Sequence, residues 1–132
     1  LGENLKSITG TAQYEVNKLS AELGNADVEL VRKELGTEFD MIVHEPDGIL
    51  EIGQAGHSKA SGIERLCASL GIAKEDTYAF GDSANDVEML EFVAHGIAMG
   101  NGTDVAKNAA EFVTTDIHKD GIWNGLKHYG LI

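Results

Sequence analysis

Cysteine and basic residues are scarce in this sequence of 132 residues. The one cysteine, Cys67, rules out an internal disulfide. Its position on an apolar helical stripe predicts a small buried side chain rather than a nucleophile. Ten Lys and Arg residues stand against 22 Asp and Glu residues, which gives a net charge of -12. This charge argues against nucleic-acid binding, which depends on cations that neutralise phosphates. Any phosphate site in so acidic a chain needs a local cation or a metal ion.

Long apolar runs are missing as well. No run of about 18 apolar residues is present, and no basic segment introduces an apolar leader. We therefore expect no membrane-spanning segment, no membrane partner and a cytoplasmic location. The remaining composition, 42% hydrophobic and 24% charged, is typical of a globular domain.

The most informative stretch is a group of polar residues that follows a short apolar run over 77–80. Asp82, Asn85 and Asp86 lie there, before an apolar pattern at helical spacing resumes. A strand, a tight turn and a helix start are predicted, the arrangement at which open α/β sheets bind ligands. Asp86 would lie one helical turn after Asp82, so the two carboxylates can share a hard cation such as Mg²⁺. The alternative is that Asp82 or Ser83 caps the helix and Asp86 complements the helix dipole.

Short strands and helices alternate along the rest of the chain. Residues 14–23 fit a strand and a helix about equally well, and we favour a strand. Further strands are expected over 39–44, 48–52, 96–99 and 112–114, and helices over 28–35, 59–70, 103–110 and 122–129. The strands over 39–44 and 48–52 should form a hairpin around Pro46. Strands that alternate with helices after residue 55 predict a parallel sheet with helices on both faces.

Several side chains receive a structural interpretation from the sequence. His44, beside the hairpin turn, could reach a substrate but is more often a solvated side chain. The run 100–103 lacks the lysine of a phosphate-binding loop, and we interpret it as a turn with Thr103 or Asp104 as a helix cap. The last helix is expected to pack on the sheet through its large side chains, Trp123, Leu126 and Tyr129.

Two motifs together resemble a known family. Residues 81–90 match the GDSxNDxxML signature of haloacid dehalogenase superfamily phosphatases, in particular the Cof-type branch with a type IIB α/β cap. Gly56-His57-Ser58-Lys59 matches the Gly-x-Ser-Lys segment of that branch, although Ala60 stands where a Gly is common. The resemblance covers roughly residues 14–131. Lys59 lies near a helix start, where a cation is unfavourable, so an acidic neighbour is expected.

The resemblance implies an α/β fold and a chemistry. Residues 1–54 would be the later part of an α+β cap, and residues 55–132 the closing part of a Rossmann-like core. The implied activity is Mg²⁺-dependent hydrolysis of small phosphorylated metabolites, such as sugar phosphates, through an aspartyl-phosphate intermediate. Asp82 would bind the metal directly, and Asp86 would act through water or by orienting Lys59. Lys59, Asn85 and Ser58 would contact the substrate.

One part of the family's site is missing from the sequence. No apolar strand carries the Asp-x-Asp-Gly-Thr motif of the nucleophile, and Asp47-Gly48 and Asp120-Gly121 lack its second aspartate. The chain also begins without Met, so we expect a fragment that is inactive alone. Strand 77–80 should then be an exposed edge that recruits a second copy or another polypeptide. The alternatives are a non-catalytic metal-binding or interaction domain, or a phosphomutase of the same superfamily.

Overall fold

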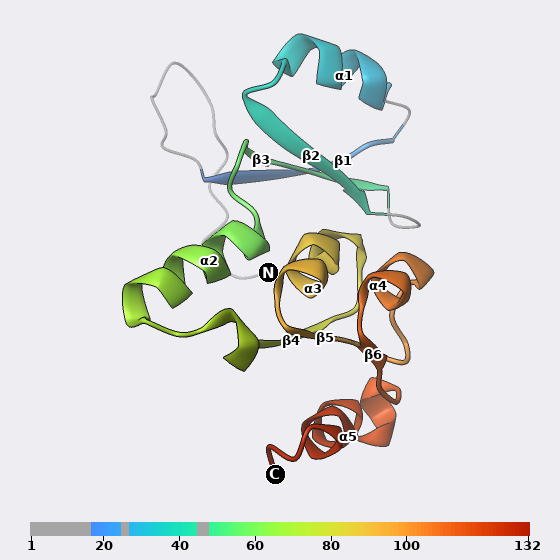
Figure 1. The fold of residues 1–132 in the computed structure, drawn as a ribbon. Coiled ribbons are helices and arrows are strands. Elements are labelled where there is room, and N and C mark those ends of the chain that lie inside the picture. Colours follow the sequence, from blue (N-terminus) through green and yellow to red (C-terminus); the bar gives the residue numbers. More distant parts are fainter. Residues whose placement is uncertain (1–16, 25–26, 45–47) are drawn as a thin grey trace, which may run out of the picture.

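The computed structural model describes residues 17–24, 27–44 and 48–132. Figure 1 shows two layered units, each with its own three-stranded sheet. We call the unit before residue 55 the cap and the unit after it the core. The cap sheet is antiparallel and the core sheet is parallel. The α/β class and the parallel sheet predicted from the sequence are therefore confirmed.

The cap consists of β1 (Lys18–Glu22), α1 (Val28–Leu35), β2 (Phe39–His44) and β3 (Ile49–Gln54), with strand order β1-β3-β2. The Asp27 carboxylate accepts hydrogen bonds from two backbone N–H groups at the start of α1, and Gly36 ends the helix with a φ of 65°. The hairpin of β2 and β3 is confirmed, while its turn at 45–47 lies outside the described residues. The strand expected over 14–23 is confirmed over 18–22.

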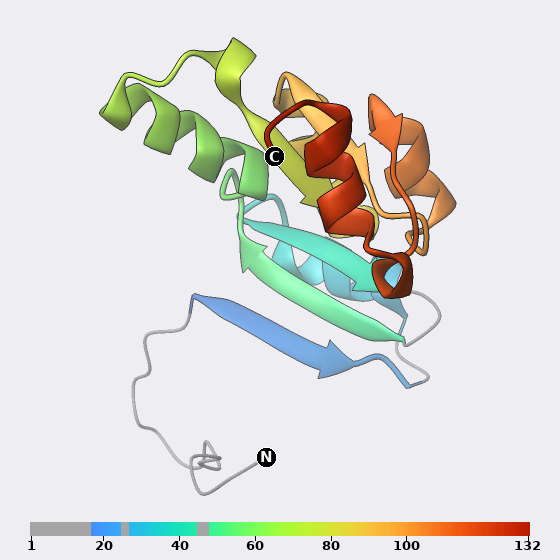
Figure 2. The same ribbon diagram turned by 90° about the horizontal axis from the view of Figure 1, so that it is seen from below.

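One face of the cap sheet is buried under α1, and the other faces the core (Figures 1 and 2). Met41 and Leu50 lie on the α1 side and are the buried apolar side chains of the described part of the cap. Side chains alternate along a strand, so Ile42 and Glu51, which are direct cross-strand partners, point the other way. The pleat thus sends polar cap side chains toward the core.

The core sheet has the order β4-β5-β6, with β4 (Tyr78–Gly81), β5 (His95–Ala98) and β6 (Phe112–Val113) all parallel. Helices α2 (Lys59–Leu70), α3 (Val87–Phe92) and α4 (Asp104–Ala109) lie on the cap side, and α5 (Gly121–His128) covers the opposite face (Figures 1 and 2). Three short 3₁₀ turns complete the core, η1 (Lys74–Asp76), η2 (Ala84–Asp86) and η3 (Ile117–Lys119). Ile97, at 0% exposure, lies in the central strand.

The packing of α5 differs from the prediction. Trp123 is 51% exposed, with the Lys127 ammonium 4.7 Å from its ring centre, so its expected packing on the sheet was wrong. Leu126 and Tyr129 are partly buried. The helix instead approaches the sheet through Gly125, where a Cβ would lie 2.6 Å from the Phe80 ring. A glycine contact brings the helix backbone too close for a large side chain to intervene.

Helix α2 is less buried than its apolar stripe suggested. Leu66 and Leu70 are 57% and 63% exposed, and Cys67 is only partly buried, so the expectation of a buried thiol is met in part. The neighbouring strand β4 pairs only with β5 and forms one edge of the described core sheet. Among the helices of the described residues, none combines the length and apolar character needed to cross a membrane.

Candidate active site

Asp86 is the anchor of the loop that follows β4. It is 4% exposed, and its Oδ2 atom accepts hydrogen bonds from the backbone N–H groups of Asp82 (2.9 Å) and Ser83 (3.2 Å). Gly81 permits this arrangement, because a Cβ there would lie 2.6 Å from the Asp86 Cβ. The capping role that the sequence left open for this stretch is therefore present, with Ser83 and Asp86 as a reciprocal capping box.

The other Asp86 oxygen contacts the Lys59 ammonium group. Lys59 is the first residue of α2, and Ser58 caps that helix by accepting a hydrogen bond from the Ser61 N–H at 3.2 Å. The contact joins Lys59 Nζ to Asp86 Oδ1. It supplies the acidic neighbour expected for a lysine at a helix start. Two segments 27 residues apart in sequence are thereby fixed to each other at one end of the core sheet.

The environment of Asp86 keeps it ionised. Burial is the largest single influence and would raise the pKa of Asp86, but hydrogen bonds from Lys59, Asp82 and Ser83 together outweigh it, so the pKa lies below its ordinary value. The Lys59 side chain, in contrast, keeps 49% of its surface exposed. A charged amine is thus held by a buried carboxylate and remains accessible.

Asp82 lies at the tip of β4 and is exposed. Within the part of the chain that the structure describes, its carboxylate has no hydrogen-bond or ion-pair partner, and no three His, Cys, Asp or Glu side chains group closely enough to hold a metal ion. The two carboxylates therefore have different surroundings. Asp86 is fully engaged by protein groups, whereas Asp82 is open to solvent.

The sequence interpretation missed how the Asp82 backbone is held. The carbonyl oxygen of Asp82 accepts a hydrogen bond from Thr103 N–H at 2.8 Å. A Cβ at Gly102 would lie 2.9 Å from that same oxygen. Thr103 also caps α4, as predicted, because its Oγ1 accepts from the Ala106 N–H. The glycines over 100–102 were the available signal, but the sequence does not show which segment packs against them.

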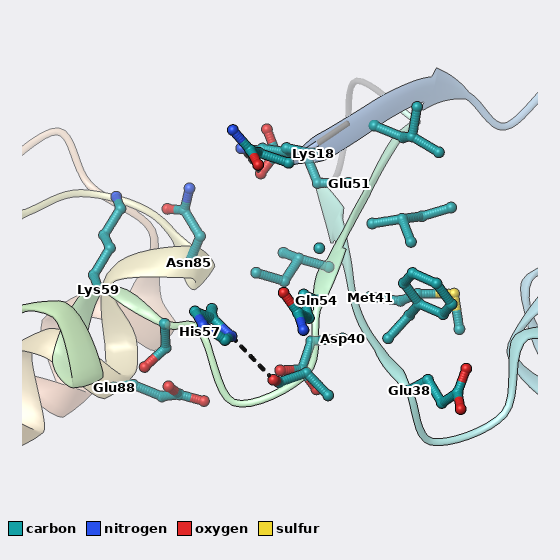
Figure 3. Close-up of a pocket in the computed structure, with 18 of the residues that line it drawn as sticks. Lys18, Glu38, Asp40, Met41, Glu51, Gln54, His57, Lys59, Asn85 and Glu88 are labelled. Carbon is teal, nitrogen blue, oxygen red and sulfur yellow. Dashed lines mark hydrogen bonds and ion pairs between the residues drawn. The ribbon is translucent and has the colours of Figure 1, made fainter. Parts of the chain in front are cut away.

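Lys59 and Asn85 line an open pocket of about 1240 Å³ between the core and the cap (Figure 3). Ser58 also contributes to its wall, and Asn85 Oδ1 accepts a hydrogen bond from Ser83 Oγ at 2.6 Å. Asp82 and Asp86 are not part of this wall. The structure therefore gathers three of the predicted site residues at the pocket and places the two carboxylates beside them, at the end of β4.

The cap side of the pocket includes Glu51, which the sequence interpretation did not single out. Glu51 accepts a hydrogen bond from Lys18 Nζ at 2.6 Å across the sheet. His44 Nε2 lies 3.2 Å from the same carboxylate oxygen. The His44 side chain is 22% exposed and this nitrogen is buried, so the solvated histidine expected from the sequence was wrong. Alternation along β2 turns His44 to the core-facing side, where Glu51 covers it.

Comparison with known proteins assigns the chain to a family. The sequence pattern of haloacid dehalogenase-like hydrolases matches residues 3–126. The chain belongs to this family. The 5-amino-6-(5-phospho-D-ribitylamino)uracil phosphatase YitU of Bacillus subtilis is 35% identical over 134 residues, which cover 98% of this chain and 46% of that protein. The superfamily resemblance of the two motifs is thus confirmed.

Two solved structures have the same fold. A sugar phosphatase of HAD subclass IIB is 31% identical with a TM-score of 0.81, and the match covers 90% of this chain and 45% of that one. A protein from Geobacillus kaustophilus HTA426 is 45% identical with a TM-score of 0.69, over 82% of this chain and 41% of that one. The chain spans less than half the length of these relatives.

Proposed function

We propose that this chain contributes the lysine and acidic motifs of a phosphatase that hydrolyses small phosphorylated metabolites. The observation that carries the proposal is the contact between Lys59 and Asp86, which holds an ammonium group at the pocket wall beside Asn85. A fixed cation offsets the negative charge of a transferring phosphoryl group. Membership in a hydrolase family and the phosphatase name of a relative support the same reaction class.

Asp82 is the residue that we expect to hold Mg²⁺. An exposed carboxylate that no described side chain engages fits a hard cation, which prefers carboxylate and water oxygens. Both oxygens of Asp86 already accept hydrogen bonds, so Asp86 suits a role through water or through Lys59. When bound, Mg²⁺ would neutralise phosphoryl charge and polarise the phosphorus–oxygen bond.

The remaining roles follow from the family resemblance. Lys59 and Asn85, with Ser58 at the start of α2, would contact the phosphoryl oxygens. The phosphoryl group would transfer to an aspartate carboxylate and then to water, through an aspartyl phosphate. The nucleophile and the additional metal ligands are expected from residues other than those of the described ranges, which contain no group of three metal-binding side chains.

Sugar or polyol phosphates are the proposed substrates. The pocket has room for such molecules, and polar cap residues line the side opposite Lys59. The names of two relatives, a ribitylaminouracil phosphate phosphatase and a sugar phosphatase, point to the same class of compound. The cap would then choose the leaving group while the core binds the phosphate.

Substitution of Asp82 in the full-length protein tests the proposal. With p-nitrophenyl phosphate and Mg²⁺, Asp82→Asn should lower kcat/KM by about 100-fold or more, because the metal contributes several kcal/mol to the transition state. Asp76→Asn, an exposed aspartate at the other end of β4, is the matched control and should leave turnover unchanged. Near wild-type turnover by Asp82→Asn would refute the assignment.

A non-catalytic metal-binding domain is the second candidate, favoured by the absence of the nucleophile's Asp-x-Asp-Gly-Thr motif from the sequence. Calorimetric titration with Mg²⁺ separates the two. Binding that depends on Asp82, with no phosphate release from any monophosphate, would support the second candidate. Binding together with release supports the phosphatase.

A further inference from the structure

Glu51 lies on the central strand of the cap sheet and points toward the core. Its direct cross-strand partners are Ser20 on β1 and Ile42 on β2. These residues lie on the face opposite Met41 and Leu50, which are buried on the α1 side. A carboxylate in the middle of a sheet has little freedom to move away, and the Glu51 side chain keeps only 20% of its surface exposed.

The two Glu51 oxygens differ in their contacts with the described residues. Oε2 lies 2.6 Å from the Lys18 ammonium nitrogen and 3.2 Å from His44 Nε2, whereas Oε1 has no partner among the described residues. The hydrogen bond from Lys18 is the main reason that the pKa of Glu51 lies below its ordinary value, with burial opposing it and His44 adding a smaller effect. The carboxylate is therefore ionised, fixed and able to accept a further hydrogen bond.

Glu51 and Lys18 line the same pocket as Lys59 and Asn85 (Figure 3). The figure shows the Lys59 and Asn85 side chains extending from the core toward the side of the cap sheet that carries Lys18 and Glu51. A molecule whose phosphate contacts Lys59 would thus present its other end to Glu51. Any group on that end meets an ionised carboxylate, one oxygen of which has no partner among the described residues.

The charged side chains around the pocket determine which leaving groups can bind near Glu51. Its wall carries the cations Lys18, Arg32 and Lys59 and the carboxylates Glu38, Asp40, Glu51 and Glu88. Lys59 is paired with Asp86 and Lys18 with Glu51. On the cap side, Lys18 and Arg32 stand against three carboxylates, so this side offers no surplus positive charge. A second anionic group on the substrate would be repelled there, while a hydroxyl group could donate to Glu51.

We propose that Glu51 is a specificity-determining residue that accepts a hydrogen bond from a leaving-group hydroxyl and excludes leaving groups that carry a second negative charge. This inference rests on the proposed phosphatase function and narrows its substrates to uncharged, hydroxyl-bearing monophosphates. Lys18 positions the carboxylate and partly offsets its charge. The proposal differs from a purely structural ion pair, whose contribution would be confined to the stability of the sheet.

The test compares two substrates that differ at one carbon. Glycerol 3-phosphate has a hydroxymethyl group where 3-phosphoglycerate has a carboxylate. For the full-length protein, the ratio of kcat/KM for the first over the second should be well above one. Glu51→Gln should lower that ratio by about tenfold, because a charge-assisted hydrogen bond and a repulsion are both lost. Lys18→Met should raise the ratio, because the carboxylate loses its counter-charge.

Two controls separate specificity from damage to the fold. Glu22→Gln makes the same change on the same sheet face, outside the pocket wall, and should leave the ratio unchanged. Turnover of p-nitrophenyl phosphate, which has no hydroxyl to donate, should be unchanged in Glu22→Gln, and thermal unfolding reports the folding of every variant. Opposite shifts for Glu51→Gln and Lys18→Met cannot arise from a general loss of stability.

The outcomes distinguish the inference from the function on which it rests. One outcome is that the wild-type protein hydrolyses both substrates while Glu51→Gln and Lys18→Met leave the kcat/KM ratio unchanged or shift it in the same direction. That result overturns the role of Glu51 and leaves the phosphatase function in place. Absence of any phosphate release by the folded wild-type protein with Mg²⁺ overturns both.

Discussion

On the core side of the pocket, Lys59 contacts a carboxylate whose side chain is 5% exposed, whereas on the cap side Lys18 contacts one that is 20% exposed. Asp86 is also fixed by two backbone N–H groups, while Glu51 is held by side chains and has one oxygen without a partner among the described residues. The core pair is therefore a rigid part of the loop after β4. The cap pair is a surface that can meet different molecules. We therefore expect the core pair to serve the proposed chemistry and the cap pair to serve the proposed recognition of the leaving group.

The distribution of buried apolar side chains follows the same division. Of the described residues, the core buries Ala79, Leu90, Val93, Ile97, Ala98, Met99 and Ala106, and the cap buries Met41 and Leu50. A unit with few buried apolar contacts opens at lower free energy than one with many. We therefore expect core substitutions to affect every substrate, and cap substitutions to affect the choice among substrates.

The largest effect is expected for Lys59→Met in the full-length protein. Loss of the ammonium group should lower kcat by about 100-fold for every phosphate ester, since one electrostatic stabiliser of the transition state is typically worth that much. Steady-state kinetics on glycerol 3-phosphate and p-nitrophenyl phosphate measure the effect. Lys33→Met, an exposed lysine of α1, is the control. A loss confined to one of the two substrates would contradict the division between core and cap.

Gly102→Ala should have the next largest effect. Its new Cβ would lie 2.9 Å from the Asp82 carbonyl oxygen, so the Asp82 loop or the 100–103 segment must shift. Overpacking of this kind costs about 1–3 kcal/mol of unfolding free energy. Urea unfolding measures that cost, and kcat should fall for all substrates. Gly62→Ala is the matched control, because nothing lies within 4 Å of its Cβ and alanine is favoured inside a helix. Equal stability of the two variants would show that close packing of Gly102 against the Asp82 carbonyl oxygen does not hold this loop.

Acid unfolding compares the two ion pairs directly. The pKa of folded Asp86 is below its ordinary value of 3.8, so its contribution to stability is present above that value and is lost as pH falls through the lower folded pKa. Lys59→Met removes one cause of that lowering, so the pKa of Asp86 should rise and the acid-unfolding midpoint followed by circular dichroism should move to higher pH. Lys18→Met should move it less, because Glu51 is more exposed. A larger shift for Lys18→Met than for Lys59→Met would contradict the expected difference between the two ion pairs.

The sequence predicted those parts of the structure that depend on local pattern. The helix over 28–35, the hairpin and the strand before Asp82 all arise from residues within a few positions of one another. Other features depend on which distant segments meet. These are the contact of Gly102 with the Asp82 carbonyl oxygen, the glycine contact of α5 and the grouping of His44 with Glu51. Large side chains such as Trp123 suggest packing by size, but the approach of the helix backbone decides it.

The smallest effect concerns the edges of the two sheets. Edge strand β1 of the cap carries Lys18 and Glu22, and charges of this kind discourage strand pairing. Edge strand β4 of the core carries no charge, and Tyr78 on it is 36% exposed. We therefore propose that the 132-residue chain self-associates weakly through β4.

Light scattering over a concentration series checks this proposal. The average mass should rise with concentration, and Tyr78→Lys should weaken the association by at least a few-fold, because an edge lysine must lose its hydration when another strand pairs with it. Leu19→Lys on β1, where the side chain is 51% exposed, is the control and should leave the mass unchanged. A folded chain that remains monomeric throughout would count against an open core edge. Association abolished by Leu19→Lys instead would show that the cap, despite its charges, supplies the contact.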